Sequence, residues 1–189
     1  KNIDKKNVTL FFVTNNSVFP SDEWVDHFSK FKEIRFVISL DGVYEVAEFV
    51  RYGKKFSRFE KNYQKWIELS NTTLKNLRVI PHFVFHSFNC LNLNKTLEWI
   101  KNFHENEKVL SYDFLESPTE ISTKYLSQDI KNYIIDCNDN FLKDKIIKFL
   151  NTGENNLSHN KKLISYYNFL NVRGEIPNEC KEIIERIKC

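Results

Sequence analysis

The stretch Val8 to Val13, Val-Thr-Leu-Phe-Phe-Val, is an apolar run that ends at the polar residues Thr14 to Ser17. Continuous runs of this kind are typical of strands buried on both faces, as in parallel sheets. Further runs follow at 34–40 and 77–85, and a shorter one lies at 109–112. The sequence therefore predicts four strands, of which this run is the first.

Helical stretches separate the predicted strands. Trp24, Phe28 and Phe31 recur at the spacing of one helical face, and the segment from Leu93 to Phe103 has the same pattern. Strands that alternate with helices are parallel and are joined by right-handed crossovers. Four such units make half of an eight-unit barrel or one open sheet. We expect an α/β fold in which residues 1–117 form a partial, half parallel (β/α) barrel.

The character of the sequence changes after Pro118. Apolar residues at helical spacing predict helices over 121–137, 141–150 and 163–170, and a last helix after Pro177. We therefore expect residues 118–189 to form a mainly helical C-terminal extension. Within the third strand, Pro81 lacks a backbone N–H, which predicts a bulge or an irregular edge there.

Composition and charge exclude several classes of protein. Lys and Arg number 28 against 25 Asp and Glu, and this net charge of +3 is too balanced to indicate a nucleic-acid partner. No run approaches the ~18 consecutive apolar residues of a membrane span. The four cysteines (Cys90, Cys137, Cys180 and Cys189) are widely scattered without CxxC spacing, so we expect no metal site in this chain. With no secretion signal, we expect a cytoplasmic protein.

The chain contains no methionine, and its first strand begins almost at once. Both features indicate a segment of a longer protein. A half barrel would also expose the edge of the strand at Val8 to Val13. Because unpaired strand edges pair with other chains, we expect a homodimer or aggregation through this edge.

Polar residues follow each predicted strand. They are Thr14, Asn15 and Asn16, then Ser39 and Asp41, then His86, Ser87 and Asn89, and finally Asp113 and Glu116. Parallel α/β sheets bind ligands at the carboxyl ends of their strands, so these residues are the candidates for a site. Hydroxyls, amides and carboxylates together suit a polar ligand with ribose, amine or carboxylate groups. His82 lies inside the third strand, where we expect it to be packed in the core.

Several of these segments resemble the motifs of radical S-adenosylmethionine (radical SAM) enzymes. Residues 12–16 (Phe-Val-Thr-Asn-Asn) resemble the TNG motif at the end of a strand in these enzymes, and residues 38–42 (Ile-Ser-Leu-Asp-Gly) resemble the SxDG motif of their next strand. Residues 51–53 (Arg-Tyr-Gly) resemble their Arg-x-Gly motif. Residues 84–89 resemble the strand and loop that come next in the family. The segment after Pro118 and the late residues 171–174 resemble the family's reduced, twitch-type C-terminal extension. The resemblance covers nearly the whole chain.

The resemblance implies a function. Enzymes of this family bind S-adenosylmethionine beside a 4Fe-4S cluster, and reductive cleavage yields a 5′-deoxyadenosyl radical that abstracts hydrogen from a substrate. By resemblance, Ser39 and Arg51 would hold the ribose or carboxylate of the cofactor, and Asn15 and Asn89 would line the site. Asp41 would shape the turn. The substrate, a small molecule or a peptide, is not indicated.

The sequence departs from the family in two ways. The CxxxCxxC motif that ligates the cluster and the Gly-Gly-Glu motif are both absent, and both belong to strands that would precede this chain. Asn16 also stands where the family has glycine. We therefore expect the cofactors only in a full-length protein, and expect this chain alone to bind neither and to be inactive.

Two other interpretations stay open. The chain could be a non-catalytic α/β module that binds a nucleotide or a partner. It could also be a nucleotide-sugar transferase, which needs a metal-binding acidic pair at a strand end. Asp113 and Glu116 come nearest to such a pair, without the usual Asp-x-Asp spacing.

Overall fold

The structure is a computed structural model that describes residues 4–154, 157–171 and 174–188. Its centre is a four-stranded sheet with the order β1-β2-β3-β4. The strands are β1 (Thr9–Thr14), β2 (Glu33–Ser39), β3 (Leu77–Phe85) and β4 (Ser111–Phe114). All three pairings are parallel, which confirms the predicted α/β class.

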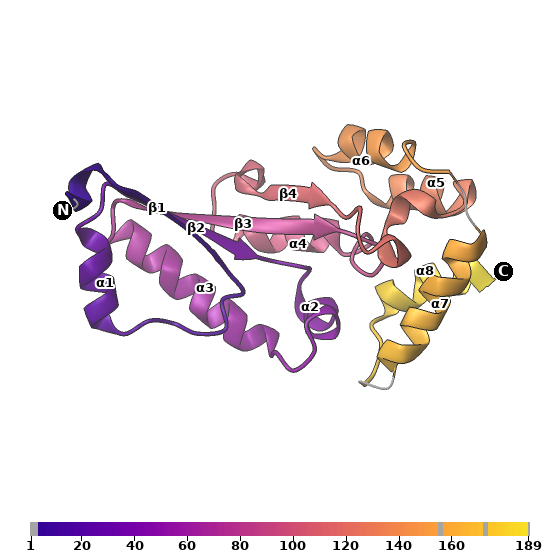
Figure 1. The fold of residues 1–189 in the computed structure, drawn as a ribbon, viewed down its shortest axis with the longest axis horizontal. Helices are drawn as coiled ribbons and strands as arrows, with labels where there is room; N and C mark the ends of the chain where they lie inside the picture. Colours follow the sequence, from indigo (N-terminus) through magenta and orange to yellow (C-terminus); the bar gives the residue numbers. More distant parts are fainter. Residues whose placement is uncertain (1–3, 155–156, 172–173, 189) are drawn as a thin grey trace.

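Helices connect the strands and follow the last one (Figure 1). The connecting helices are α1 (Asp22–Ser29), α2 (Tyr44–Val50), α3 (Phe56–Asn71) and α4 (Leu93–Lys101). After β4, the described residues form α5 (Gln128–Cys137), α6 (Lys143–Leu150), α7 (Leu157–Asn171) and α8 (Asn178–Lys188), together with short 3-10 turns. Among the described residues, no helix has the length and apolar character that crossing a membrane would require.

The two faces of the sheet differ. Since the strands lie in sequence order, right-handed crossovers place the helices between them on one face. Ile34 and Phe83 point to this face and are fully buried. Phe11 and Val13 point to the opposite face and are each 64% exposed. We call this opposite face the open face; it comprises the side chains of Phe11, Val13, Arg35, Val37, Arg78, Ile80, His82, Val84, Ser39, Ser111 and Asp113.

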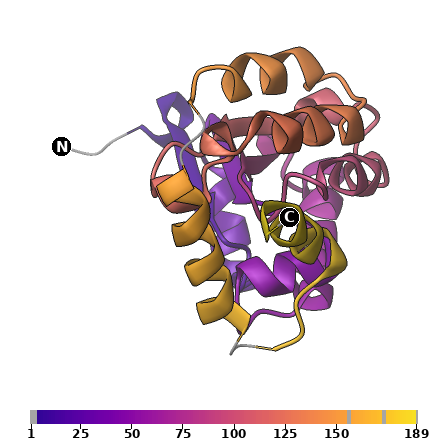
Figure 2. The ribbon, with the colours of Figure 1, turned by 90° about the vertical axis from the view of Figure 1, so that its right-hand side faces the viewer.

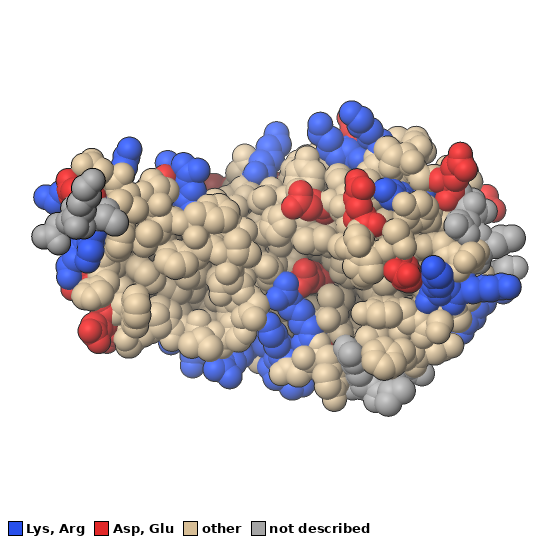
Figure 3. Space-filling model, in the orientation of Figure 1, with Lys and Arg blue, Asp and Glu red and all other residues tan. Residues whose placement is uncertain are grey.

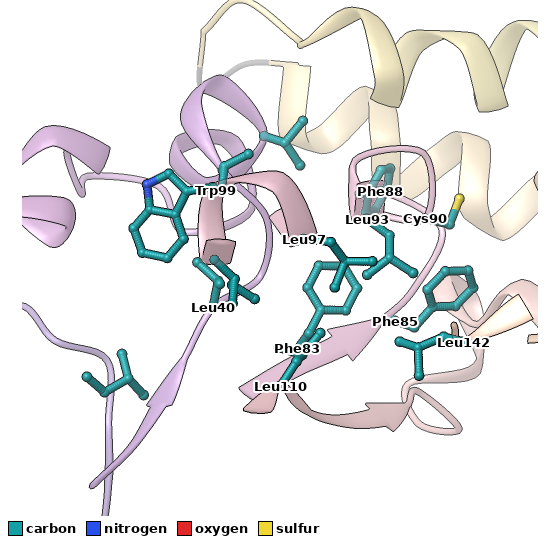
Figure 4. Packing of buried hydrophobic residues seen from close by; sticks show 14 of the residues in the cluster. Leu40, Phe83, Phe85, Phe88, Cys90, Leu93, Leu97, Trp99, Leu110 and Leu142 are labelled. Atoms are coloured by element: carbon teal, nitrogen blue, oxygen red, sulfur yellow. The ribbon is translucent and has the colours of Figure 1, made fainter. Parts of the chain in front are cut away.

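The core fills the space between the sheet and its helices. Phe83 of β3 and Leu97 of α4 lie side by side in it, and Phe85 lies beside Leu142 at the start of the C-terminal helices (Figure 4). One cluster of buried apolar side chains runs from Val25 to Ile184, so the helical part packs on the same core. The division at residue 117 stays a prediction.

The C-terminal helices lie beyond the carboxyl ends of the strands. The arrows of β3 and β4 point toward α5 and α7 in Figure 1, and Figure 2 views the molecule from that end, with α7 and α8 in front. The loops that follow the strands therefore lie between the sheet and the last helices.

Of the two alternatives that the sequence predicted at Pro81, a bulge is not formed, and the residue instead lies at a stretch of the edge of β3 that pairs with no strand described on that side. The β2–β3 register runs without a break from Ile34↔Leu77 to Ser39↔His82. The Leu40 amide donates to the His82 carbonyl, so even-numbered residues of β3 turn their backbone groups toward β2. Pro81 turns away, toward β4, whose pairing with β3 begins only at His82. The missing N–H therefore costs no ladder hydrogen bond.

Candidate functional site

The candidate site lies at the carboxyl end of β2. Ser39 is the last residue of this strand, and the chain then turns through Asp41 into α2, which Arg51 ends. Ser39, Asp41 and Arg51 line one small pocket of about 20 Å³, together with Lys54 and Phe59. The structure thus brings together two of the four predicted site residues, Ser39 and Arg51.

The Arg51 guanidinium is held by Asp41. Its Nε donates to the Asp41 carboxylate, and both side chains are largely shielded from solvent. Asp41 therefore orients Arg51, in addition to its predicted place in the turn. A guanidinium has five N–H donors, so the terminal nitrogens of Arg51 remain for a planar anion such as a carboxylate.

Basic side chains dominate the wall of the pocket beside α2. Figure 3 shows them gathered there, with acidic side chains next to them. Lys55 pairs with Glu48 at 3.1 Å. Partial burial, and then the charge of Arg51, lower the pKa of Lys54. Because an anion would relieve this repulsion, the pocket favours a negatively charged group.

Asn89 supports the pocket from the neighbouring loop. Its side-chain amide donates to the carbonyls of Asp41 at 3.2 Å and Val84 at 2.8 Å, and its Oδ1 accepts from the His86 N–H at 2.8 Å. Asn89 is fully buried. It thus holds the loop that carries Asp41, and its contact with a ligand stays a prediction.

Asn15 lies apart from the lining of the pocket. It is exposed, and its side-chain oxygen accepts from the backbone N–H of Ser17 at 3.1 Å. In the sheet register Thr14 pairs with Ile38, so Asn15 continues β1 beside Ser39. Its predicted ligand contact also stays a prediction.

Asn16 follows β1 and is the residue expected, by the resemblance alone, to replace a glycine. Its φ is +57°, in the left-handed region that glycine favours and that asparagine tolerates better than other residues. Its side-chain amide donates to the carbonyl of Phe59 at 2.9 Å. Asn16 therefore adopts the left-handed turn and connects it by a hydrogen bond to Phe59 in the wall of the pocket.

His86 is the histidine that follows β3, and it is buried. Its Nδ1 accepts from the Phe88 N–H at 3.2 Å. Burial lowers the pKa of His86 to about 4, although the charge of nearby Asp41 acts in the opposite direction. The imidazole is therefore neutral at physiological pH and supports the loop as a hydrogen-bond acceptor.

His82 does not lie in the core, contrary to the prediction. It points to the open face, where Ser111 and Asp113 of β4 are its neighbours. The apolar residues at 77, 79, 83 and 85 alternate along β3, and this alternation is the sequence signal that places His82 on the opposite face.

The cysteines do not fit an iron–sulfur cluster. Cys90 and Cys180 are buried, and burial raises the pKa of both thiols. Cys137 is partly buried, and Cys189 lies outside the described residues. In the described part of the chain, no three His, Cys, Asp or Glu side chains are grouped to hold a metal. Cluster ligands would have to come from elsewhere.

Comparisons with protein-family models, with curated proteins and with solved structures find no match for this chain. A proposal for its function therefore depends on its own motifs and on the geometry of the pocket.

Proposed function

We propose that this chain is part of a radical SAM enzyme and that the pocket of Ser39 and Arg51 binds S-adenosylmethionine. The observation that carries the proposal is that these two residues, with Asp41, line one pocket at the end of β2. Both come from the segments whose sequence resembles the family's motifs. The left-handed turn at Asn16, in the place of the family's glycine, supports the same proposal.

The side chains in the pocket suit the polar groups of this cofactor. The Arg51 guanidinium, oriented by Asp41, can bind a carboxylate through two parallel hydrogen bonds. The Ser39 hydroxyl can donate to or accept from a ribose hydroxyl. When bound beside a reducing cluster, S-adenosylmethionine supplies a 5′-deoxyadenosyl radical. The described residues of this chain would bind and orient the cofactor.

The sheet suits the barrel part of such an enzyme. Four parallel strands in sequence order, with the crossover helices on one face, are the arrangement of a segment of a (β/α) barrel. In this proposal the open face lines the interior of the barrel, and the helices after residue 117 form the twitch-type extension. A cytoplasmic location and a small-molecule or peptide substrate belong to the same proposal.

Binding of S-adenosylhomocysteine, a stable relative of the cofactor, to the full-length protein tests the pocket by calorimetry. We expect Arg51→Gln to weaken binding about 10- to 100-fold, which corresponds to the loss of about 1.5–3 kcal/mol from a charged hydrogen bond. Ser39→Ala should weaken it about fivefold. Arg58→Gln, at an exposed position of α3, is the matched control and should bind as wild type. Absence of binding, or equal affinities of all four proteins, would refute the proposal.

The longer gene product that the proposal requires offers a second test. When it is expressed anaerobically, we expect iron–sulfur absorption and the release of 5′-deoxyadenosine on reduction. A CxxxCxxC motif should precede Lys1, about 60–80 residues upstream by the length of barrel units. If no such motif precedes the chain, the enzyme proposal fails.

A nucleotide-binding module is the second candidate. The cations Arg51, Lys54 and Lys55 outnumber the anions Asp41 and Glu48 in the pocket by one, and this favours it because phosphates bind cationic side chains. Tighter binding of ADP than of S-adenosylhomocysteine would select this candidate. The transferase interpretation has less support, because among the described residues no three His, Cys, Asp or Glu side chains, Asp113 and Glu116 included, are grouped to hold a metal.

A further inference from the structure

A row of polar side chains crosses the open face near the carboxyl ends of the strands. Ser39 of β2 is the register partner of His82 of β3, and His82 is the register partner of Ser111 of β4. Register partners on neighbouring parallel strands lie about 5 Å apart and point to the same face. Asp113 lies two residues further along β4, on the same face.

The imidazole of His82 is held between two of these side chains. Its Nδ1 is hydrogen-bonded to the Ser111 hydroxyl at 3.2 Å, and its Nε2 lies 3.4 Å from a carboxylate oxygen of Asp113. The His82 side chain is 19% exposed, whereas that of Asp113 is 75% exposed. The ring is therefore oriented and shielded, while the carboxylate presents lone pairs to whatever lies on the open face.

An apolar side chain lies beside Asp113. Val84 of β3 is the register partner of Asp113, points to the open face and is partly exposed. A ligand that places a polar group on Asp113 can lay its hydrocarbon part on Val84. The pairing of an exposed carboxylate with an apolar surface is the chemistry that recognises an aliphatic amine.

We propose that His82, Ser111 and Asp113 form a second binding site on the open face, and that this site takes an aliphatic primary amine with a neighbouring hydroxyl group. The ammonium group pairs with Asp113, and the hydroxyl group bonds to Ser111. An anion is repelled by the carboxylate. One part of this inference rests on the proposed function, namely that the amine belongs to the substrate of the enzyme. The reason for this part is that the site lies one strand away from the cofactor pocket at Ser39.

Ethanolamine, which carries both groups, is the probe. Its addition at millimolar concentration should shift the ring signals of His82 in a ¹H–¹³C NMR spectrum, in a saturable manner. The spectrum of His82→Gln identifies these signals. Asp113→Asn should weaken the binding at least tenfold, and Ser111→Ala should weaken it several-fold. Asp129→Asn, an exposed carboxylate of α5, is the matched control and should bind as wild type.

Two further probes test the class of ligand. Ethylene glycol, which has the hydroxyls without the ammonium, and acetate, which is an anion, should shift the His82 signals much less than ethanolamine. Equal shifts with ethylene glycol, or larger shifts with acetate, would overturn the proposal, as would silent His82 signals with ethanolamine. Binding of S-adenosylhomocysteine is measured separately through Arg51, so the two sites can fail independently.

Discussion

The side-chain amide of Asn62 donates to the backbone carbonyl of Asn16 at 2.9 Å and so joins α3 to the turn after β1. In return, the Asn16 side chain donates to the carbonyl of Phe59 at 2.9 Å. Both asparagines are buried. The two bonds place the pocket residue Phe59 relative to the end of β1, and the left-handed turn at Asn16 makes both of them geometrically accessible.

Substitution of Asn16 separates the effect of its hydrogen bond from that of its backbone conformation. Asn16→Gly loses the bond to Phe59 but accepts the φ of +57° without strain. Asn16→Ala loses the same bond and also adds strain, so it should lower the free energy of unfolding by about 1 kcal/mol more. Urea unfolding measures both values. Equal losses in the two variants would show that the backbone conformation is not costly.

Gly42 and Gly53 form a matched pair for the turns around α2. Both have positive φ, +129° and +83°. A Cβ on Gly42 would lie 3.0 Å from Asn92 Oδ1 and 3.0 Å from Val46 Cγ1, whereas a Cβ on Gly53 would meet nothing within 4 Å. The Asn92 oxygen also accepts from the Val43 N–H at 2.8 Å, so it cannot move freely.

We therefore expect Gly42→Ala to destabilise the protein more than Gly53→Ala. Gly53→Ala should lower the free energy of unfolding by about 1–2 kcal/mol through backbone strain. Gly42→Ala should add a loss of about 1–3 kcal/mol to the same strain, because its Cβ overpacks the site. Thermal unfolding followed by circular dichroism compares them. A Gly53→Ala variant less stable than Gly42→Ala would contradict the packing described around Asn92.

His86 makes stability depend on pH. Its pKa is about 4 in the folded protein, against 6.5 for a free side chain, because burial disfavours the imidazolium. Between these two values the unfolded chain binds a proton that the folded chain does not, so stability falls as the pH falls from 6.5 toward 4. The loss from this one group is about 3 kcal/mol.

His86→Asn should remove this part of the pH dependence. Asparagine does not titrate, and its Oδ1 can still accept from the Phe88 N–H. Chemical unfolding at a series of pH values should give the variant a shallower decline than wild type. Some decline should remain, because burial also lowers the pKa of His104. Parallel declines in the two proteins would show that folding does not change the pKa of His86.

The edge of β1 should mediate self-association. β1 is the first strand of the sheet, and among the described residues no strand pairs with its outer edge. We propose that this edge pairs with another copy of the chain. Phe11→Lys places a charge on the edge strand and should shift the protein toward monomer in light scattering at high concentration.

Val18→Lys is the control for this experiment. Val18 is also exposed and apolar, but it lies in the loop after β1, so the variant has the same added charge without changing the strand. It should associate as wild type does. A wild-type protein that stays monomeric at high concentration would refute association through the edge.

Local sequence patterns determined much of this fold. The apolar runs predicted the strands, because burial of apolar side chains follows the periodicity of each element. The spacing of Trp24, Phe28 and Phe31 predicted a helix there, although α1 ends at Ser29 and buries Val25 and Phe28 while Trp24 is exposed. The predicted parallel sheet followed from the alternation of strands and helices. The position of Ser39 at the end of β2 followed in the same way, whereas Arg51 was singled out only by the resemblance to the Arg-x-Gly motif.

Tertiary structure alone decided which side chains meet. Asn89 reaches the carbonyl of Asp41, 48 residues away, and Asn62 reaches that of Asn16. His82 meets Ser111 only because the β3–β4 register aligns them. Such contacts depend on the register of strands and on the path of loops. A short sequence window does not encode either of these, because the same alternation of side chains is compatible with several registers.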